Sequence, residues 1–306
     1  MALPPPMCFQ MSKLFPFLMN TETNEDYGAI EQERLDAQAA AIVEMIGGVP
    51  FLAPSQRAMA VSRAVDVGCG TGVATMQLAA MFPHAKVYGL DISPVPKTAR
   101  EMAPENTVWM VGNVLDMERD DGANDPASRD IFTAGGLDYI FGRMLFLGIN
   151  DWARYFSIAS HSLAPGGIIE HQDLDWEFYR AGSSECLSDK WEWHKTVIAA
   201  AAQSGLAVHS GSGAAALMKA AGLEVIDVQT FEFSFVPSSK TPNSQAMGRY
   251  VQKKLVPNYP ELLRKMLGSS GIGWEELERM TAQCLLDIGS EEGLHQKYVV
   301  TLARKP

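Results

Sequence analysis

Cysteine is scarce in this chain of 306 residues, which contains Cys8, Cys69, Cys186 and Cys284. None of the four belongs to a CxxC pair, so the sequence gives no indication of a metal site of the structural zinc type. Cys69 stands inside a glycine-rich stretch, where a disulfide would obstruct any ligand. We therefore expect reduced cysteines and a cytoplasmic location.

Basic residues and long apolar runs are also in short supply. The chain has 25 Lys and Arg against 36 Asp and Glu, a net charge of -11, which argues against a nucleic-acid partner because such binding depends on neutralising phosphates. No run approaches the roughly 18 apolar residues of a membrane helix, and Met1 to Asn20 lacks the pattern of a signal peptide. We expect no membrane partner.

The most informative stretch that is present reads AVDVGCGTG and begins at Ala64. Its first four residues are typical of a short buried strand, the glycines permit a sharp turn, and Val73 to Met81 is expected to be a helix. Dinucleotide-binding proteins carry GxGxxG, whereas this chain has GxGxG with an acid, Asp66, two positions before it. The spacing favours S-adenosyl-L-methionine (SAM), although a plain tight turn stays open.

In this interpretation the loop holds the amino-acid tail of SAM. Asp66 faces the ammonium group, and the loop amides face the carboxylate. The residues expected to make the loop contacts are Gly68, Cys69, Gly70 and Gly72.

Two further strands are expected to complete the cofactor site. Lys86 to Asp91 ends in an acid about 20 residues beyond the glycines, the interval at which a ribose is bound; Asp91 is the candidate for the ribose hydroxyls, and Ile92 for the adenine face. Capping of the next helix is the alternative role of Asp91.

The third strand, Thr107 to Val111, leads to Asn113 and Val114, which we expect beside the adenine. The side-chain carbonyl of Asn113 can accept a hydrogen bond from the adenine amino group. A purely conformational role for Asn113 in a turn stays open, with Asp116 as the fallback residue.

The chain alternates strands and helices from residue 63, which predicts an α/β fold with a mostly parallel sheet covered on both faces. The motifs above resemble class I SAM-dependent methyltransferases, and more narrowly the fungal LaeA-like proteins (UMTA or TAM-domain methyltransferases), over Tyr27 to Pro306. The narrower resemblance rests on Glu31 to Asp36, Phe141-Gly142-Arg143, Asn150-Asp151-Trp152 and Leu163 to Gly167 leading to Glu170.

This resemblance implies a Rossmann-like sheet whose last strand is antiparallel, SAM as the cofactor, and methyl transfer to a small secondary-metabolite acceptor. We expect an N-terminal segment and helices acting as a lid, a SAM-binding core, two helical lid insertions, and two strands that return to the core. Their expected ranges are 1–62 (lid), 63–175 (core), 176–221 (insertion), 222–236 (strand), 237–289 (insertion) and 290–306 (strand).

The acceptor-side candidates follow the fourth and fifth strands, because ligands of open parallel sheets bind beyond the strand carboxyl ends. His171 has a pKa suited to accepting a proton, and Arg143 either holds an acidic group or pairs with Glu170. A metal site of Glu170, His171, Asp173 and Asp175 is a minor alternative, and we expect no metal.

Aromatic residues between Trp176 and Trp193, with sixteen methionines in the chain, favour an apolar or aromatic acceptor. Two other functions stay open: a methyltransferase fold recruited as a pericyclase or cyclase, and a regulatory protein without enzymatic activity. A homodimer is also compatible with the sequence.

Overall fold

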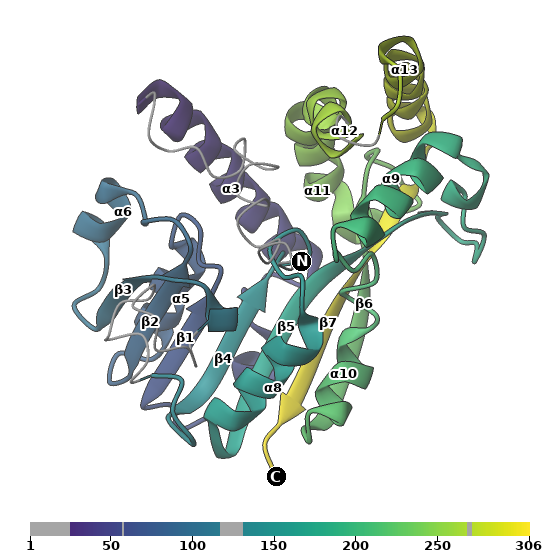
Figure 1. Cartoon of the computed structure of the whole chain (residues 1–306). Helices are drawn as coiled ribbons and strands as arrows, with labels where there is room; N and C mark the ends of the chain where they lie inside the picture. Colours follow the sequence, from purple (N-terminus) through teal and green to yellow (C-terminus); the bar gives the residue numbers. More distant parts are fainter. Residues whose placement is uncertain (1–24, 57, 117–130, 268–270) are drawn as a thin grey trace, which may run out of the picture.

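The structure, a computed structural model, describes residues 25–56, 58–116, 131–267 and 271–306 (Figure 1). Residues 1–24 of the expected N-terminal lid lie outside the described residues. A single sheet with the strand order β3-β2-β1-β4-β5-β7-β6 organises the chain.

Strands β1 to β5 pair in parallel, and β7 pairs antiparallel with both β5 and β6. The expected mostly parallel sheet with an antiparallel last strand is therefore confirmed. The strands are β1 (Arg63–Val67), β2 (Lys86–Asp91), β3 (Thr107–Val111), β4 (Leu137–Arg143), β5 (Leu163–Arg180), β6 (Glu224–Ser234) and β7 (Leu294–Arg304).

Helices cover both faces of this sheet. The α-helices are α3 (Glu25–Met45), α4 (Leu52–Gln56), α5 (Val73–Met81), α6 (Lys97–Met102), α8 (Trp152–Ser162), α9 (Glu192–Gln203), α10 (Ala214–Ala220), α11 (Gln245–Tyr250), α12 (Tyr259–Leu267) and α13 (Trp274–Ser290). Short 3₁₀ turns are η1 (Val114–Asp116), η2 (Ser188–Lys190), η3 (Pro242–Ser244) and η5 (Val256–Asn258), and η4 (Val251–Leu255) is a π-helical turn.

The two faces have separate cores because successive strand side chains point to opposite sides. On β1, Ala64 belongs to the core that includes residues of α3, α4 and α5, whereas Val65 belongs to the core that includes residues of α8 and α10. Both side chains are fully buried. Because β1 is covered on both faces, its residues do not alternate between apolar and polar, and Asp66 is the one buried acid among them.

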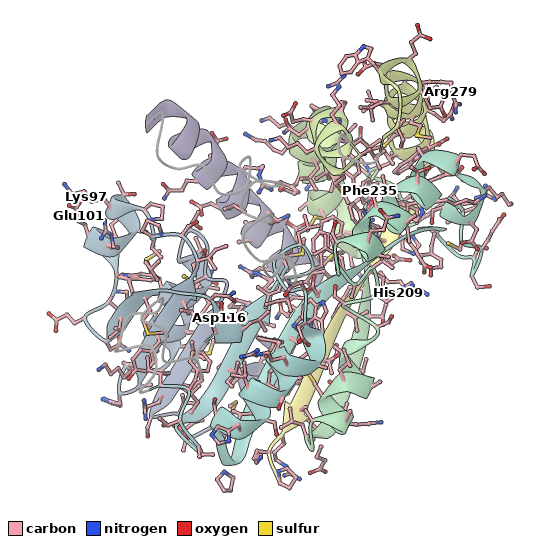
Figure 2. The ribbon with its side chains drawn as sticks, in the orientation of Figure 1. Lys97, Glu101, Asp116, His209, Phe235 and Arg279 are labelled. Carbon is pink, nitrogen blue, oxygen red and sulfur yellow. The ribbon has the colours of Figure 1, made fainter. Side chains whose placement is uncertain are left out.

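The helices α9, α12 and α13 pack against one another, and α11 packs against α3. With α3 they lie beyond the end of the sheet at which β4 and β5 end (Figure 1). Figure 2 shows Phe235 inside this region and Arg279 on the outer side of α13, where its side chain is exposed. In the described part of the chain, no helix combines the length and apolar character that crossing a bilayer requires.

One element differs from the sequence-based expectations. The sequence predicts a fifth strand that follows the Pro165-Gly166-Gly167 turn and ends near Glu170, whereas β5 begins at Leu163 and continues to Arg180. The extended part of β5 pairs with β7 after a register shift between Leu174 and Phe178. The strand can run this far because β7 supplies partners for most residues from Ile168 to Arg180, which the local sequence does not reveal.

Candidate active site

The glycine loop joins β1 to α5 and is tied to β2. The amides of Gly68 and Cys69 both donate to the carbonyl of Leu90, at 2.8 and 3.1 Å. Gly70 and Gly72 have φ values of +53° and +84°, in the left-handed region that favours glycine. The loop backbone is therefore held in a conformation that side chains at these two positions would strain.

Asp91 supports the loop from the end of β2. One carboxylate oxygen accepts from the Gly70 amide at 2.8 Å, and the other accepts from the Ser93 amide at 2.9 Å. Burial raises the pKa of Asp91, and these amides oppose the rise. A carboxylate has about four lone-pair sites, so acceptor capacity remains for a ribose hydroxyl. Ile92, beside it, is 46% exposed.

Asp66 lies behind the loop. Its side chain is buried, and Thr75 Oγ1 at the start of α5 donates to it at 2.6 Å. Burial raises the pKa of Asp66 to about 7, opposed by the Thr75 hydrogen bond and by the positive charge of Arg143. The geometry thus makes Asp66 a support between β1 and α5, outside the cavity lining.

Asn113 forms the turn that follows β3. Its Oδ1 accepts from the Leu115 amide at 3.0 Å, and its Nδ2 donates to Asp116 at 3.0 Å. Val114, the first residue of η1, is buried. The conformational role that the sequence left open for Asn113 is therefore present.

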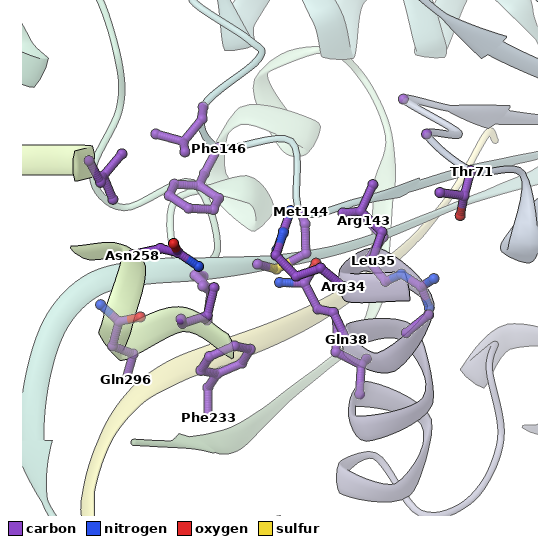
Figure 3. Close-up of a pocket in the computed structure, with 18 of the residues that line it drawn as sticks. Arg34, Leu35, Gln38, Thr71, Arg143, Met144, Phe146, Phe233, Asn258 and Gln296 are labelled. Atoms are coloured by element: carbon purple, nitrogen blue, oxygen red, sulfur yellow. The ribbon is translucent and has the colours of Figure 1, made fainter. Parts of the chain in front are cut away.

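A cavity of about 280 Å³ begins at the glycine loop and runs beneath the helices (Figure 3). Thr71 lies at one end and Gln296 at the other, with Arg143 and Met144 between them. The main apolar lining residues are Leu35, Ile42, Met144, Phe146, Leu147, Leu174, Trp176, Phe233, Phe235, Leu255, Tyr259 and Leu262.

Helix α3 forms one wall of this cavity. Thr71 Oγ1 donates to Asp36 at 2.9 Å, which joins the glycine loop to the helix, and Arg34 Nη1 donates to Tyr250 on α11 at 2.9 Å. Leu35 and Gln38 of the same helix also line the cavity. Helix α3 is thus connected both to the glycine loop and to α11.

Arg143 is the cation at the centre of the cavity lining. Its guanidinium lies 5.7 Å from the centre of the Phe141 ring, and its buried Nη1 has no hydrogen-bond partner among the described residues. The sequence left open an ion pair between Arg143 and Glu170. The Glu170 carboxylate instead accepts hydrogen bonds from the start of α4, from Tyr139 and from Gln172. Arg143 therefore has a donor available for a bound anionic group.

Glu170 does not lie at the acceptor side, so its expected catalytic placement is wrong. The fully buried carboxylate accepts from the amides of Leu52 and Ala53 and from Tyr139 Oη, each at 2.8 Å, and from Gln172 Nε2 at 2.6 Å. Burial raises the pKa of Glu170, and these hydrogen bonds oppose the rise. Its role is to hold α4 against the sheet.

The sequence-based placement of His171 at the acceptor side is also wrong. It is fully buried on the opposite face of β5, where Trp152 and Phe156 of α8 pack edge-on against its ring at centroid distances of 5.2 and 5.5 Å. Burial lowers its pKa to about 4, and the Ser210 carbonyl opposes this. A neutral imidazole that is sealed from the cavity does not accept a proton from a ligand there.

The cavity therefore brings together only part of the predicted site. Four of the predicted residues line it: Gly68, Cys69, Gly70 and Arg143. The other predicted residues lie outside the lining: Asp66, Gly72, Asp91, Ile92, Asn113, Val114, Glu170 and His171. Sequence reasoning missed several lining residues that reach the cavity from segments distant in sequence: Arg34, Gln38, Phe233, Phe235 and Gln296.

The acids of β5 do not form the minor metal site considered from the sequence. Asp173 accepts from the amides of Leu145 and Leu174, and Asp175 accepts from the Ser212 amide at 2.9 Å. These backbone contacts assign both carboxylates to the fold.

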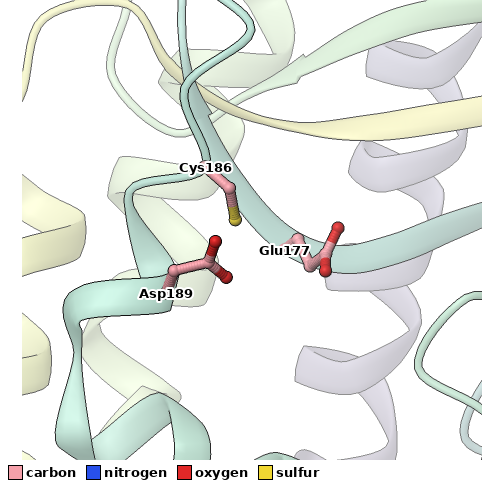
Figure 4. Close-up of side chains that lie close together, drawn as sticks. All are labelled: Glu177, Cys186 and Asp189. Carbon is pink, nitrogen blue, oxygen red and sulfur yellow. The ribbon is translucent and has the colours of Figure 1, made fainter.

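A different group, Glu177, Cys186 and Asp189, places three ligand-type atoms within 4.8 Å of one another (Figure 4). Burial raises the pKa of the Cys186 thiol, and Tyr179 Oη donates to Glu177. A protonated thiol is a poor metal ligand. This group lies outside the cavity lining.

Comparisons with known proteins agree with this geometry. A family model described as a methyltransferase domain matches residues 36–228. The secondary metabolism regulator laeA of Coprinopsis cinerea is 32% identical over 38% of this chain and 26% of its own length. The methyltransferase str2 of Strobilurus tenacellus is 28% identical over 48% of this chain and 47% of its own. The matches thus extend over a quarter to about half of these relatives.

Among solved structures, phosphoethanolamine N-methyltransferase 2 of Haemonchus contortus, in complex with SAM, superposes with a TM-score of 0.50. Its sequence is 15% identical, and the superposition covers 96% of this chain and 60% of that one. At this identity the likeness shows the fold. Since the family model covers more than half of the residues, the chain belongs to the methyltransferase domain family, with the class I SAM-methyltransferase fold and LaeA-like relatives.

Proposed function

We propose that this protein binds SAM and transfers its methyl group to a small, largely apolar acceptor. The observation that carries the proposal is the continuity of the cavity, which runs from the glycine loop to an aromatic wall formed by β5, β6 and α12 (Figure 3). A methyl donor on the loop and an acceptor against the wall would share one enclosed space, as an in-line displacement requires.

The residues around the loop fit the cofactor. A methyl group added at Gly70 would point toward Leu35, with its nearest atom 3.9 Å away, so the loop surface is open to a ligand there. In the proposal Asp91 binds the ribose, Ile92, Asn113 and Val114 surround the adenine, and Arg143 faces the carboxylate of the amino-acid tail. The available Nη1 donor of Arg143 supports the last assignment.

When bound, SAM supplies an electrophilic methyl group, and transfer leaves S-adenosylhomocysteine. The chain itself contributes alignment and the exclusion of water. Among the described residues that line the cavity there is no histidine, and the carboxylate of Glu261 pairs with Lys265 at 3.3 Å. The site therefore suits acceptors that need little help in losing a proton, such as acidic phenols, carboxylates or amines.

We further propose that α3 and the helices α11 and α12 act as the lid over this space. Their contacts support this role, because α3 holds the glycine loop through Asp36 and holds α11 through Arg34. An acceptor from fungal secondary metabolism is supported by the names of the relatives from Coprinopsis cinerea and Strobilurus tenacellus.

The test is an assay for S-adenosylhomocysteine with SAM and a panel of aromatic hydroxyl, carboxyl and amine acceptors. Acceptor-dependent product is the expected result. A second candidate, a regulatory role, is favoured by the laeA relative, which is named as a regulator. SAM binding without product from any acceptor, together with a stable complex with another protein, would favour regulation over small-molecule methylation.

A further inference from the structure

Gln296 occupies the end of the cavity opposite the glycine loop. It lies on β7, paired with Phe178 of β5 and Phe233 of β6. The side chain is only 2% exposed, yet its Nε2 has no hydrogen-bond partner in the described part of the chain. Burying an amide N–H without an acceptor is unfavourable, so an apolar residue would suit the fold better at this position.

The surroundings of Gln296 are aromatic. Phe235 packs edge-on against Tyr259 at a centroid distance of 5.9 Å, and Phe146 packs edge-on against Trp176 at the same distance. All four rings line the cavity. Flat aromatic faces around a single amide donor are suited to a planar ligand that carries one hydrogen-bond acceptor.

Three other polar side chains of the cavity lining have partners of their own. Arg34 donates to Tyr250, Lys265 pairs with Glu261, and Asn258 Nδ2 donates to the Lys254 carbonyl at 2.7 Å. Figure 3 places Asn258 and Phe233 beside Gln296, far from Thr71. The donor at this end is thus a neutral amide, which matches a neutral oxygen better than an anionic group.

We propose that Gln296 is a substrate-recognition residue, and that the acceptor is a planar aromatic molecule whose carbonyl oxygen receives the Nε2 hydrogen bond. The inference rests on the proposed function and deepens it. The methylated atom of such an acceptor points toward the glycine loop, and the carbonyl occupies the opposite end. Discrimination between acceptors then depends on the carbonyl rather than on the atom that is methylated.

The test compares 9-fluorenone with fluorene, two planar probes of similar shape that differ in one carbonyl oxygen. Binding is followed by quenching of tryptophan fluorescence, since Trp176 lines the cavity. We expect the wild-type protein to bind fluorenone about 5- to 50-fold more tightly than fluorene, the factor that one buried hydrogen bond supplies. In Gln296→Leu the two probes should bind equally, with fluorene no weaker than before.

Gln296→Met serves as a second apolar variant, and thermal melting verifies that each variant is folded. No preference for fluorenone in the wild type, binding of neither probe, or a preference that survives both substitutions would overturn the inference. A parallel titration with SAM separates this failure from that of the proposed function. SAM affinity unchanged in Gln296→Leu is expected, whereas a wild type that does not bind SAM contradicts the proposed function alone.

Discussion

Replacing Asp91 with alanine perturbs the proposed cofactor site most sharply. The carboxylate accepts from the Gly70 and Ser93 amides at 2.8 and 2.9 Å and is assigned to the ribose. Loss of a charge-assisted hydrogen bond to a ribose hydroxyl, with loosening of the loop, should cost about 1–3 kcal/mol of SAM binding. The dissociation constant should rise about 5- to 150-fold, measured by calorimetric titration.

Asp138→Ala is the matched control. Asp138 also accepts two backbone amides, from Ser62 at 2.8 Å and Arg63 at 3.0 Å, but it stands at the amino end of β4, away from the cavity. Both substitutions remove a carboxylate that holds two amides, so both should lower the free energy of unfolding. Only Asp91→Ala should weaken SAM binding. Equal SAM affinity in the two variants would refute the assignment of Asp91 to the ribose.

Three other predictions concern Asp66, Glu170 and Gly72. Because the pKa of Asp66 is about 7 in the folded protein against 3.8 when unperturbed, its burial should lower stability progressively as the pH rises from about 4 to about 7. Urea unfolding of Asp66→Asn should therefore show a gain over wild type that grows across this range; a difference independent of pH would contradict the raised pKa. Glu170→Gln places an NH₂ group against the amide of Leu52 or Ala53, so it should lower the free energy of unfolding by about 1–3 kcal/mol. SAM affinity should be retained. Loss of methyl transfer at an unchanged melting temperature would show instead that Glu170 is catalytic. In thermal melting, Gly72→Ala should be far more destabilising than Gly48→Ala. The φ values of the two glycines match, at +84° and +85°, but only at Gly72 would the new methyl group lie 2.5 Å from Trp109. Similar losses of melting temperature in the two variants would show that the Trp109 ring moves aside.

The glycine loop could be predicted because its signals are local. A short apolar strand, glycines at turn positions and a following helix lie within 18 consecutive residues, 64 to 81. The end of β2 at Asp91 could also be predicted, since this strand is short and bounded. The antiparallel placement of the last strand followed from the family resemblance and was confirmed.

Glu170 and His171 show where such reasoning fails. Both were placed at the end of a strand expected to stop near Glu170, but β5 continues to Arg180. Mid-strand residues of a central strand are covered on both faces, so Glu170 lies against α4 and His171 under α8. The length of β5 depends on pairing with β7, more than a hundred residues later in the chain.

The acceptor end of the cavity could not be assembled from the sequence for a related reason. Phe233, Tyr259 and Gln296 come from β6, α12 and β7, and each is unremarkable in its own segment. Only the packing of the helices over the sheet brings them together. The aromatic residues after Trp176 did indicate an apolar pocket, although of these only Trp176 itself lines it.

The most direct test of the cofactor assignment is a crystal structure of the protein with S-adenosylhomocysteine. We expect density along the glycine loop, with the ribose within hydrogen-bond distance of Asp91 and the carboxylate facing Arg143. Density at another site, or an empty loop at saturating ligand, would contradict the assignment of this cavity to SAM-dependent methyl transfer.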